Sequence, residues 1–257
     1  MRVFLDPGHG GNDPGAVANG MRESDIVLDI GLRLAALLER AGIATLMSRA
    51  MDYRPVNRAK MANDWGADLC VSLHVNAGGG TGVETIIPTA SPGNPARDLV
   101  ANRRLAEYIS KALGAAFGLR VRRAAGVMLE TETRHDFVGV LRNTRMISVL
   151  PEIAFIDAPG GSPDLNVLRN RRQEVANTLY AVICTWVTDK EDSLIRYQTI
   201  EEINKNASWA ADTVKILISN GIIRGNEECL NLSEDLLRML VWNHRAGLYD
   251  HIPGAAA

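Results

Sequence analysis

The stretch FLDPGHGGNDPG, residues 4–15, places four glycines, two prolines, two aspartates and a histidine directly after the first apolar run of the chain. A turn needs only one or two residues of these kinds, so we interpret this density as a functional site. The glycines that flank His9 allow unusual backbone angles and a close approach by other groups. Neither G-x-x-x-x-G-K-S/T nor G-x-G-x-x-G occurs here, so the stretch is not a phosphate-binding loop.

Beyond this stretch, apolar runs that predict strands alternate with helical periodicities. The predicted strands cover residues 2–6, 43–48, 68–77, 82–88 and 147–156, and the predicted helices cover 24–42, 55–66, 95–118 and 164–187. Strands that alternate with long helices indicate an α/β fold, with a mostly parallel sheet and helices on both faces. Ser24 is expected to cap the helix that it begins.

Three ionisable side chains stand at or near the ends of predicted strands. His9 follows the first strand, His74 lies near the end of the third, and Glu152 lies within the last. Because sites in open α/β sheets form at the carboxyl ends of strands, we expect these three residues at one rim.

The types of these residues, with Glu23, point to a metal. A histidine on a buried strand needs a partner for its ring nitrogens, and a metal would supply one to His74. Glu23 is open to two interpretations, an acid that complements the helix dipole or a ligand. Two histidines and one carboxylate, with a fourth position left open, are typical of a catalytic zinc site.

The other histidines favour ordinary roles. His135, in a polar loop, is either a surface residue or a substrate contact. His244 and His251 lie near the end of the chain and are interpreted as structural or surface residues. The three cysteines lie far apart without a CxxC pair, so they do not form a disulfide framework.

Five motifs now occur in a recognisable order: DPGHGG, a glutamate before a long helix, SLHVNA, GVET and VLRNTRMISVLPEIAFID. Together they resemble the zinc-dependent N-acetylmuramoyl-L-alanine amidases of the amidase-3 type, over residues 1–187. The resemblance implies one Zn²⁺ held by His9, Glu23 and His74, with Glu152 as the catalytic carboxylate. It further implies peptidoglycan as the substrate, cleaved at the amide between the lactyl group of N-acetylmuramic acid and L-alanine.

Chemistry supports a role for Glu152 beside the resemblance. Amide hydrolysis needs a group that takes a proton from water and passes it to the leaving nitrogen. Glu152 is the only acid in ISVLPEIAFI, where a buried carboxylate is costly unless it is paired or used. The alternative is an exposed acid on an edge strand. Pro151 replaces the aliphatic residue usual in the family and donates no ladder hydrogen bond, which indicates an edge position or a bulge.

Four further residues are candidates for supporting roles. Glu84, in GVET, is the reserve candidate for the base and is better suited to supporting the site or facing the substrate. Asn76, Arg142 and Asn143 are close in sequence to the proposed site residues. They are either donors to the peptide or sugar, or packing and turn residues.

After residue 187 the sequence changes character. We interpret residues 188–205 as a linker and 206–257 as a small all-α unit with helices over 207–221 and 232–247. SWAADTVKILISNGIIRGN with LSEDLLRMLVWNHRAG resembles one S-layer-homology-like repeat, which implies binding to a secondary cell-wall polymer. The alternatives are a helical cap or a unit that forms a homodimer. The hydrophobic core of so small a unit gives only marginal stability, so we expect the unit to pack against a partner or against the catalytic domain.

Charge and hydropathy limit the partners and the location. A net charge of −2 gives no reason to expect nucleic acid, and the longest apolar stretch is too short to cross a membrane. No secretory signal is visible, so we expect synthesis in the host cytoplasm and action at the cell wall after release. This combination resembles a phage or prophage endolysin, with a host autolysin as the alternative.

Two other function classes remain open. A non-catalytic peptidoglycan-binding protein on the same fold would be expected to lack a ligand or the glutamate, and none is missing here. Another zinc hydrolase, such as a carboxypeptidase, would need a positive residue placed for a terminal carboxylate. The identity of the bond that is cleaved separates all three classes.

Overall fold

The computed structural model describes residues 1–90, 98–133, 138–192, 196–197 and 199–220, with residues 223, 230, 232–233, 237, 240–241 and 244. His135, His251 and Cys229 lie outside the described residues. The chain divides into two compact units, Met1–Cys184 and Thr185–Ala257. Among the described residues, no helix combines the length and apolar character that crossing a membrane requires.

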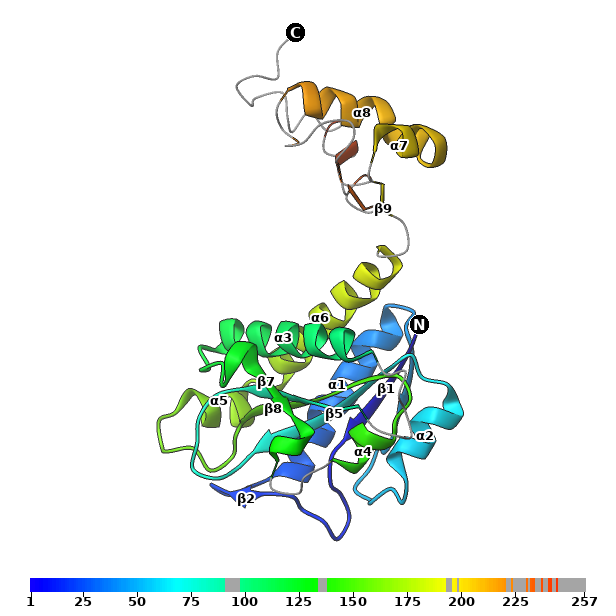
Figure 1. The fold of residues 1–257 in the computed structure, drawn as a ribbon. Helices are drawn as coiled ribbons and strands as arrows, with labels where there is room; N and C mark the ends of the chain where they lie inside the picture. The colour runs from blue at the N-terminus through cyan, green and yellow to red at the C-terminus, as the bar shows by residue number, and fades with distance from the viewer. Residues whose placement is uncertain are drawn as a thin grey trace. The chain divides into compact units, whose positions relative to one another are not determined.

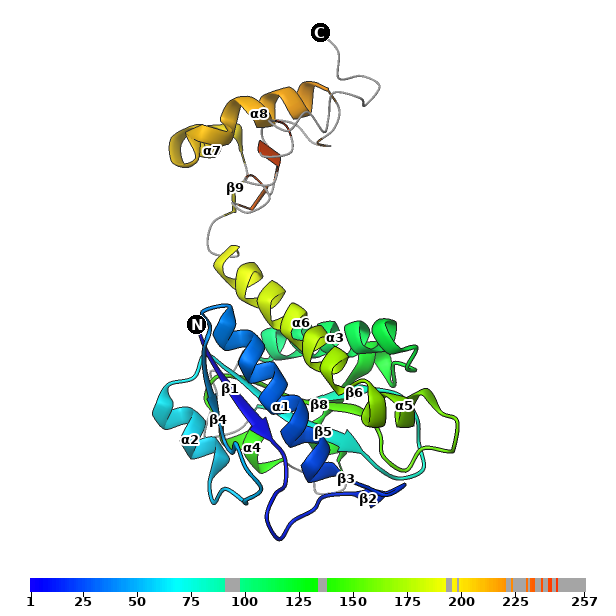
Figure 2. The ribbon, with the colours of Figure 1, turned by 180° about the vertical axis from the view of Figure 1, so that it is seen from behind.

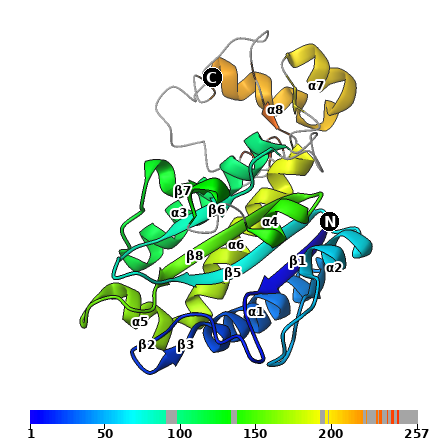
Figure 3. The same ribbon diagram turned by 60° about the horizontal axis from the view of Figure 1, so that its bottom comes forward.

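The first unit is built on a six-stranded sheet with the order β4-β1-β5-β8-β6-β7. Figure 3 labels β1, β5, β8, β6 and β7 of this sheet. All neighbours in it run parallel except β6 and β8. The prediction of a mostly parallel sheet is therefore confirmed, although β7 was not among the predicted strands. The strands are β1 (Arg2–Pro7), β4 (Ala44–Met47), β5 (Leu69–Asn76), β6 (Glu84–Ile87), β7 (Val127–Leu129) and β8 (Ile147–Phe155).

Helices cover both faces of this sheet (Figures 1 and 2). Phe4 and Cys70 pack with Ala62 of α2 on one face, and α4 packs beside α2 there. Successive side chains of a strand alternate between faces, and on the opposite face Gly31 of α1 lies close to Leu73. The helices of this unit are α1 (Glu23–Arg40), α2 (Arg58–Trp65), α3 (Leu99–Phe117), α4 (Gly139–Asn143) and α5 (Pro163–Asn170), with short turns η1 (Ala124–Gly126) and η2 (Glu130–Glu132). Helix α6 (Arg172–Asp192) begins in this unit and continues past Cys184.

The start of α1 differs from the sequence prediction. A small hairpin of β2 (Val17–Ala18) and β3 (Met21–Arg22) leads directly into the helix, whose first residue is Glu23. The amides of Glu23 and Ser24 donate to the carbonyls of Ala16 and Pro14. These loop carbonyls take the place of a side-chain cap, so the prediction that Ser24 caps the helix is wrong, and Ser24 is instead buried in the first turn.

The predicted helix over 164–187 is two helices. Ser162 caps α5 by accepting from the amide of Asp164, and Pro163 occupies the first turn. Arg171 then leaves the helical conformation, with φ −122°, and α6 begins at the next residue. The side chain of Arg33 on α1 donates to Gln173, which ties the start of α6 to α1.

The second unit contains α7 (Ile200–Asn206), α8 (Ser208–Ser219) and an antiparallel pair of β9 (Arg196–Tyr197) and β10 (Leu232–Ser233). Tyr197 and Leu232 pair across β9 and β10 and are both buried in the core of this unit. The prediction that this unit is all-α is therefore wrong in this detail. The two short strands form because their pairing brings Tyr197 and Leu232 into the core of the unit. The segment predicted as a linker, 188–205, contains the end of α6 and most of α7, and most of the helix predicted over 232–247 lies outside the described residues.

Candidate metal centre

The glycine-rich stretch after β1 brings three side chains into a small volume. A Cβ atom on Gly8 would lie only 2.4 Å from Cε1 of His74. One on Gly15 would lie 2.5 Å from Oε2 of Glu23 and 2.6 Å from Cδ2 of His9. Real Cβ atoms do not approach other atoms so closely, so glycine at these two positions is what allows the three side chains to converge.

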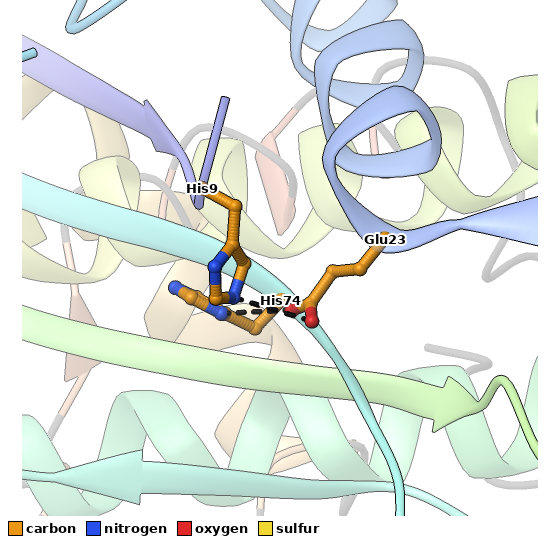
Figure 4. Close-up of side chains that lie close together, drawn as sticks. All are labelled: His9, Glu23 and His74. Carbon is orange, nitrogen blue, oxygen red and sulfur yellow. Dashed lines mark hydrogen bonds and ion pairs between the residues drawn. The ribbon is translucent and has the colours of Figure 1, made fainter. Parts of the chain in front are cut away.

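His9, Glu23 and His74 point toward one another (Figure 4), and one potential ligand atom from each lies within 4.8 Å of the others. Nε2 of His9 lies 3.2 Å from Oε2 of Glu23. Nδ1 of His74 lies 2.9 Å from Oε1 of the same carboxylate. The structure thus brings together the three residues that the sequence proposes as ligands, from the loop after β1, the start of α1 and the end of β5.

Glu23 is held in place by the backbone on both sides. The amide of Val75 donates to Oε1 at 3.1 Å, and the amide of Ala16 donates to Oε2 at 2.9 Å. Burial raises the pKa of Glu23, but hydrogen bonds and charge from His74 and His9 outweigh it and hold the pKa far below its usual range. Glu23 is therefore a carboxylate with both oxygens directed at the two imidazoles.

Asp13 adds a second carboxylate that the sequence reasoning did not assign. Its Oδ1 lies 3.0 Å from Nδ1 of His9, on the side of the ring away from Glu23. Burial lowers the pKa of His9, but the hydrogen bonds and negative charges of Glu23 and Asp13 outweigh it and raise the pKa above its ordinary value. A carboxylate on the second nitrogen of a histidine is the usual way to orient a metal ligand. The available signal was an acid four residues after His9 in the same loop.

The donor set fits a divalent metal such as zinc. Two imidazole nitrogens and a carboxylate oxygen are ligands that zinc prefers, and three protein ligands leave one position open. Because Gly8 has no side chain, the His74 ring can lie against its backbone. The backbone donors on Glu23 and the carboxylate on His9 supply the outer contacts that such sites use.

Glu152 lies beside this cluster, in register opposite His74 of β5 and Glu84 of β6. Its Oε2 atom is buried, and among the described residues it has no hydrogen-bond partner. Burial, helped by the negative charges of Glu23 and Glu84, raises the pKa of Glu152 well above its ordinary value. A carboxyl group with a pKa raised in this way holds a proton more tightly than an ordinary carboxyl group does.

The alternative of an exposed acid on an edge strand is wrong for Glu152, because β8 lies between β5 and β6. The edge position suggested for Pro151 is wrong for the same reason, and Pro151 pairs with Thr85 of β6. The register between β5 and β8 does shift, but it does so between His74 and Asn76, beyond the proline.

Glu84 is fully engaged by its neighbours. Its Oε1 accepts from Nδ2 of Asn76 at 2.8 Å and from Nε of Arg122 at 3.0 Å. Its Oε2 accepts from Nε of Arg123 at 2.8 Å. Because Glu84 is only 2% exposed and both of its oxygens are bound, this geometry suits a supporting role better than that of a base.

Arg142 and Asn143 lie together on α4. The carbonyl of Asn143 accepts from Nδ2 of Asn63 on α2. Asn143 also lines a groove of about 370 Å³ together with Asn57 and Arg58. The structure thus places Asn143 on the side of α4 that meets α2, and Arg142 is half-buried on the same short helix.

Comparison with known proteins identifies relatives of this chain. Residues 3–185 match the family model described as N-acetylmuramoyl-L-alanine amidase. The chain is 36% identical over 163 residues to the N-acetylmuramoyl-L-alanine amidase CwlM of Bacillus licheniformis, which covers 61% of this chain and 57% of that protein. It is 38% identical over 162 residues to the endolysin of Bacillus phage SPP1, which covers 60% of this chain and 55% of that protein.

A solved structure shares the fold. The N-acetylmuramoyl-L-alanine amidase of Clostridium difficile 630 superposes with a TM-score of 0.61 at 26% identity, over 74% of this chain and 97% of that one. The chain spans only about half the length of the curated relatives just described.

Proposed function

The chain belongs to the N-acetylmuramoyl-L-alanine amidase family of the amidase-3 type, and from this premise we propose that it hydrolyses peptidoglycan. The bond proposed is the amide between N-acetylmuramic acid and L-alanine. One observation carries the proposal: His9, Glu23 and His74 converge within 4.8 Å, and Glu152 stands in register beside His74. All four residues lie within the matched range.

We propose zinc as the metal, held by His9, Glu23 and His74. When bound, zinc would polarise the scissile carbonyl and make water a stronger acid. Asp13 would keep the His9 ring oriented through Nδ1, and the amides of Ala16 and Val75 would keep the Glu23 carboxylate in place.

Glu152 is the group proposed to move the proton. It would take a proton from the attacking water and deliver it to the amine that leaves on L-alanine. The raised pKa suits both steps. It makes the Glu152 carboxylate a stronger base toward the water, and it lets the carboxyl group keep the proton until the amine accepts it. Asn76, Arg122 and Arg123 would hold Glu84 as a fixed neighbour of Glu152.

The decisive experiment digests purified Gram-positive peptidoglycan with the zinc-loaded protein and with the chelated protein. New alanine amino termini and new reducing ends are counted. We expect zinc-dependent alanine termini without reducing ends. Release of a free amino acid from the carboxyl end of the stem peptide would instead favour a carboxypeptidase-type hydrolase. Wall binding without any cleavage by a zinc-loaded protein would favour the non-catalytic reading.

We further propose that the protein acts at the cell wall after release from the cytoplasm, as an endolysin. The similarity to the SPP1 endolysin supports this role, and the similarity to CwlM supports a bacterial autolysin as the alternative. For residues 206–257 we propose binding to a secondary cell-wall polymer, with homodimer formation as the alternative. Sedimentation of the full chain with walls before and after extraction of that polymer, together with its mass in solution, separates these two roles.

A further inference from the structure

Two arginine side chains donate hydrogen bonds to the loop that carries His9. Arg49 follows β4 and is 1% exposed, and Arg58 begins α2 with its side chain 16% exposed. Burying a guanidinium is costly unless its N–H groups find acceptors. The acceptors found here belong to the metal-site loop.

Arg49 bridges two of the segments that carry proposed ligands. Its Nε donates to the carbonyl of Pro7 at 3.0 Å, and its Nη2 donates to the carbonyl of Gly8 at 2.8 Å. The same Nη2 donates to the carbonyl of Ser24 at 2.7 Å. One rigid guanidinium thus joins the two residues before His9 to the residue after Glu23.

Arg58 completes the set from the other side. Its Nη2 donates to the carbonyl of His9, and its Nη1 donates to the carbonyl of Pro7 at 2.7 Å. Nη1 also pairs with Oδ1 of Asp6. Asp6 is fully buried and accepts from the hydroxyls of Ser48 and Ser72, so Arg58 is itself anchored to the sheet.

The consecutive carbonyls of Pro7, Gly8 and His9 all accept from these two side chains. The backbone at His9 has φ +56°, in the left-handed region that residues other than glycine adopt uncommonly. Arg49 and Arg58 therefore hold the carbonyls of this turn in place.

We propose that Arg49 and Arg58 are positioning residues of the metal centre. They hold the His9 turn at the distance from Glu23 and His74 at which the three donor atoms can share one ion. This inference rests on the proposed metal site. Lysine in either position would keep the positive charge but would lose the planar fork that reaches several carbonyls at once.

The test compares the full-length wild-type protein with R49K and R58K. Zinc affinity is measured by competition with a chromophoric chelator, without any wall substrate. We expect the zinc dissociation constant of each variant to rise by about 10–100-fold, as when other outer contacts of a metal ligand are removed. The matched control is R172K. Arg172 is also partly buried and donates to a carbonyl, that of Leu168, and its variant should bind zinc like the wild type.

A second measurement follows the metal-free proteins. Amide hydrogen exchange of Gly8, Gly10 and Gly11 should be faster in R58K than in R172K at equal global stability. If R49K does not fold, R58K carries the test because its side chain is more exposed. Wild-type zinc affinity in a folded R58K, with unchanged exchange in the turn, would overturn the proposal.

The proposal can fail separately from the proposed function. A wild-type protein that binds zinc but cleaves no wall would refute the amidase and leave the positioning role to be decided by the affinities. A wild-type protein that binds no zinc would refute the metal site itself. The exchange rates would then decide only whether the arginines order the turn.

Discussion

Glu152 of β8 and His74 of β5 are register partners across two parallel strands in the interior of the sheet. A side chain and its register partner point to the same face, so the proposed proton carrier and one proposed ligand share one face of the sheet. Glu84 of β6 stands opposite Glu152 on the other side. The sheet thereby aligns a ligand, a proton carrier and a supporting acid across three adjacent strands.

Replacing Glu152 should separate metal binding from turnover. We expect E152A to lose activity by about 100-fold or more, the usual contribution of a general acid–base. Zinc affinity should stay at the wild-type value, because Glu152 is not one of the three converging residues. Rates of release of alanine termini and the zinc content of the purified variant test this. Full activity in E152A would remove Glu152 from the mechanism.

Replacing His74 should abolish both zinc binding and turnover. H74A removes one of the three donors and also the imidazole partner of Glu23 Oε1, which keeps its hydrogen bond from the amide of Val75. Zinc at 100 times its dissociation constant should stabilise the wild-type protein by about 2.7 kcal/mol. Thermal unfolding with and without zinc should show this rise in the wild type and none in H74A. An equal rise in both proteins would place the metal elsewhere.

Gly8 should not tolerate alanine. The new Cβ would overlap the His74 ring at 2.4 Å, so the ring or the loop must move. We expect G8A to lose about 1–3 kcal/mol of stability, as other overpacked sites do, and to bind zinc more weakly. G139A is the matched control, because a Cβ on Gly139 meets nothing within 4 Å. Denaturant unfolding and zinc competition on both variants test the expectation, and similar behaviour of the two would contradict it.

Replacing Glu84 should shift the pH dependence of the reaction. The negative charge of Glu84 contributes to the raised pKa of Glu152. E84Q removes that charge and leaves Arg122 and Arg123 without their shared carboxylate, and both changes favour the ionised form of Glu152. The acidic limb of kcat/KM against pH should therefore move to lower pH. A shift to higher pH would show that Glu84 does not act on Glu152 through its charge.

Much of the architecture could be predicted from local pattern. The alternation of apolar runs and helical periodicities predicted the parallel sheet with helices on both faces, because these periods depend on neighbouring residues only. The start of α1 could not be predicted this way. Its first amides bind the carbonyls of Pro14 and Ala16, and these contacts exist only when the loop has folded back.

For the site, the sequence proposed His9, Glu23, His74 and Glu152 from their types and from family motifs. It proposed no role for Asp13, Arg49 or Arg58. Arginine and aspartate in polar segments have the same local appearance whether they face solvent or bind a loop. The contacts of Arg49 and Arg58 with the His9 turn join residues that are far apart in the sequence.

The sequence by itself determined which chemical groups are present and the α/β alternation that sends the ends of several strands to one rim. The density of glycine in residues 4–15 already indicated that something must come close to that backbone. Only the tertiary structure decided what comes close, namely the His74 ring at Gly8 and the Glu23 carboxylate at Gly15. It also placed β8 inside the sheet rather than at its edge. Strand order and side-chain convergence are long-range packing outcomes, and no local pattern encodes them.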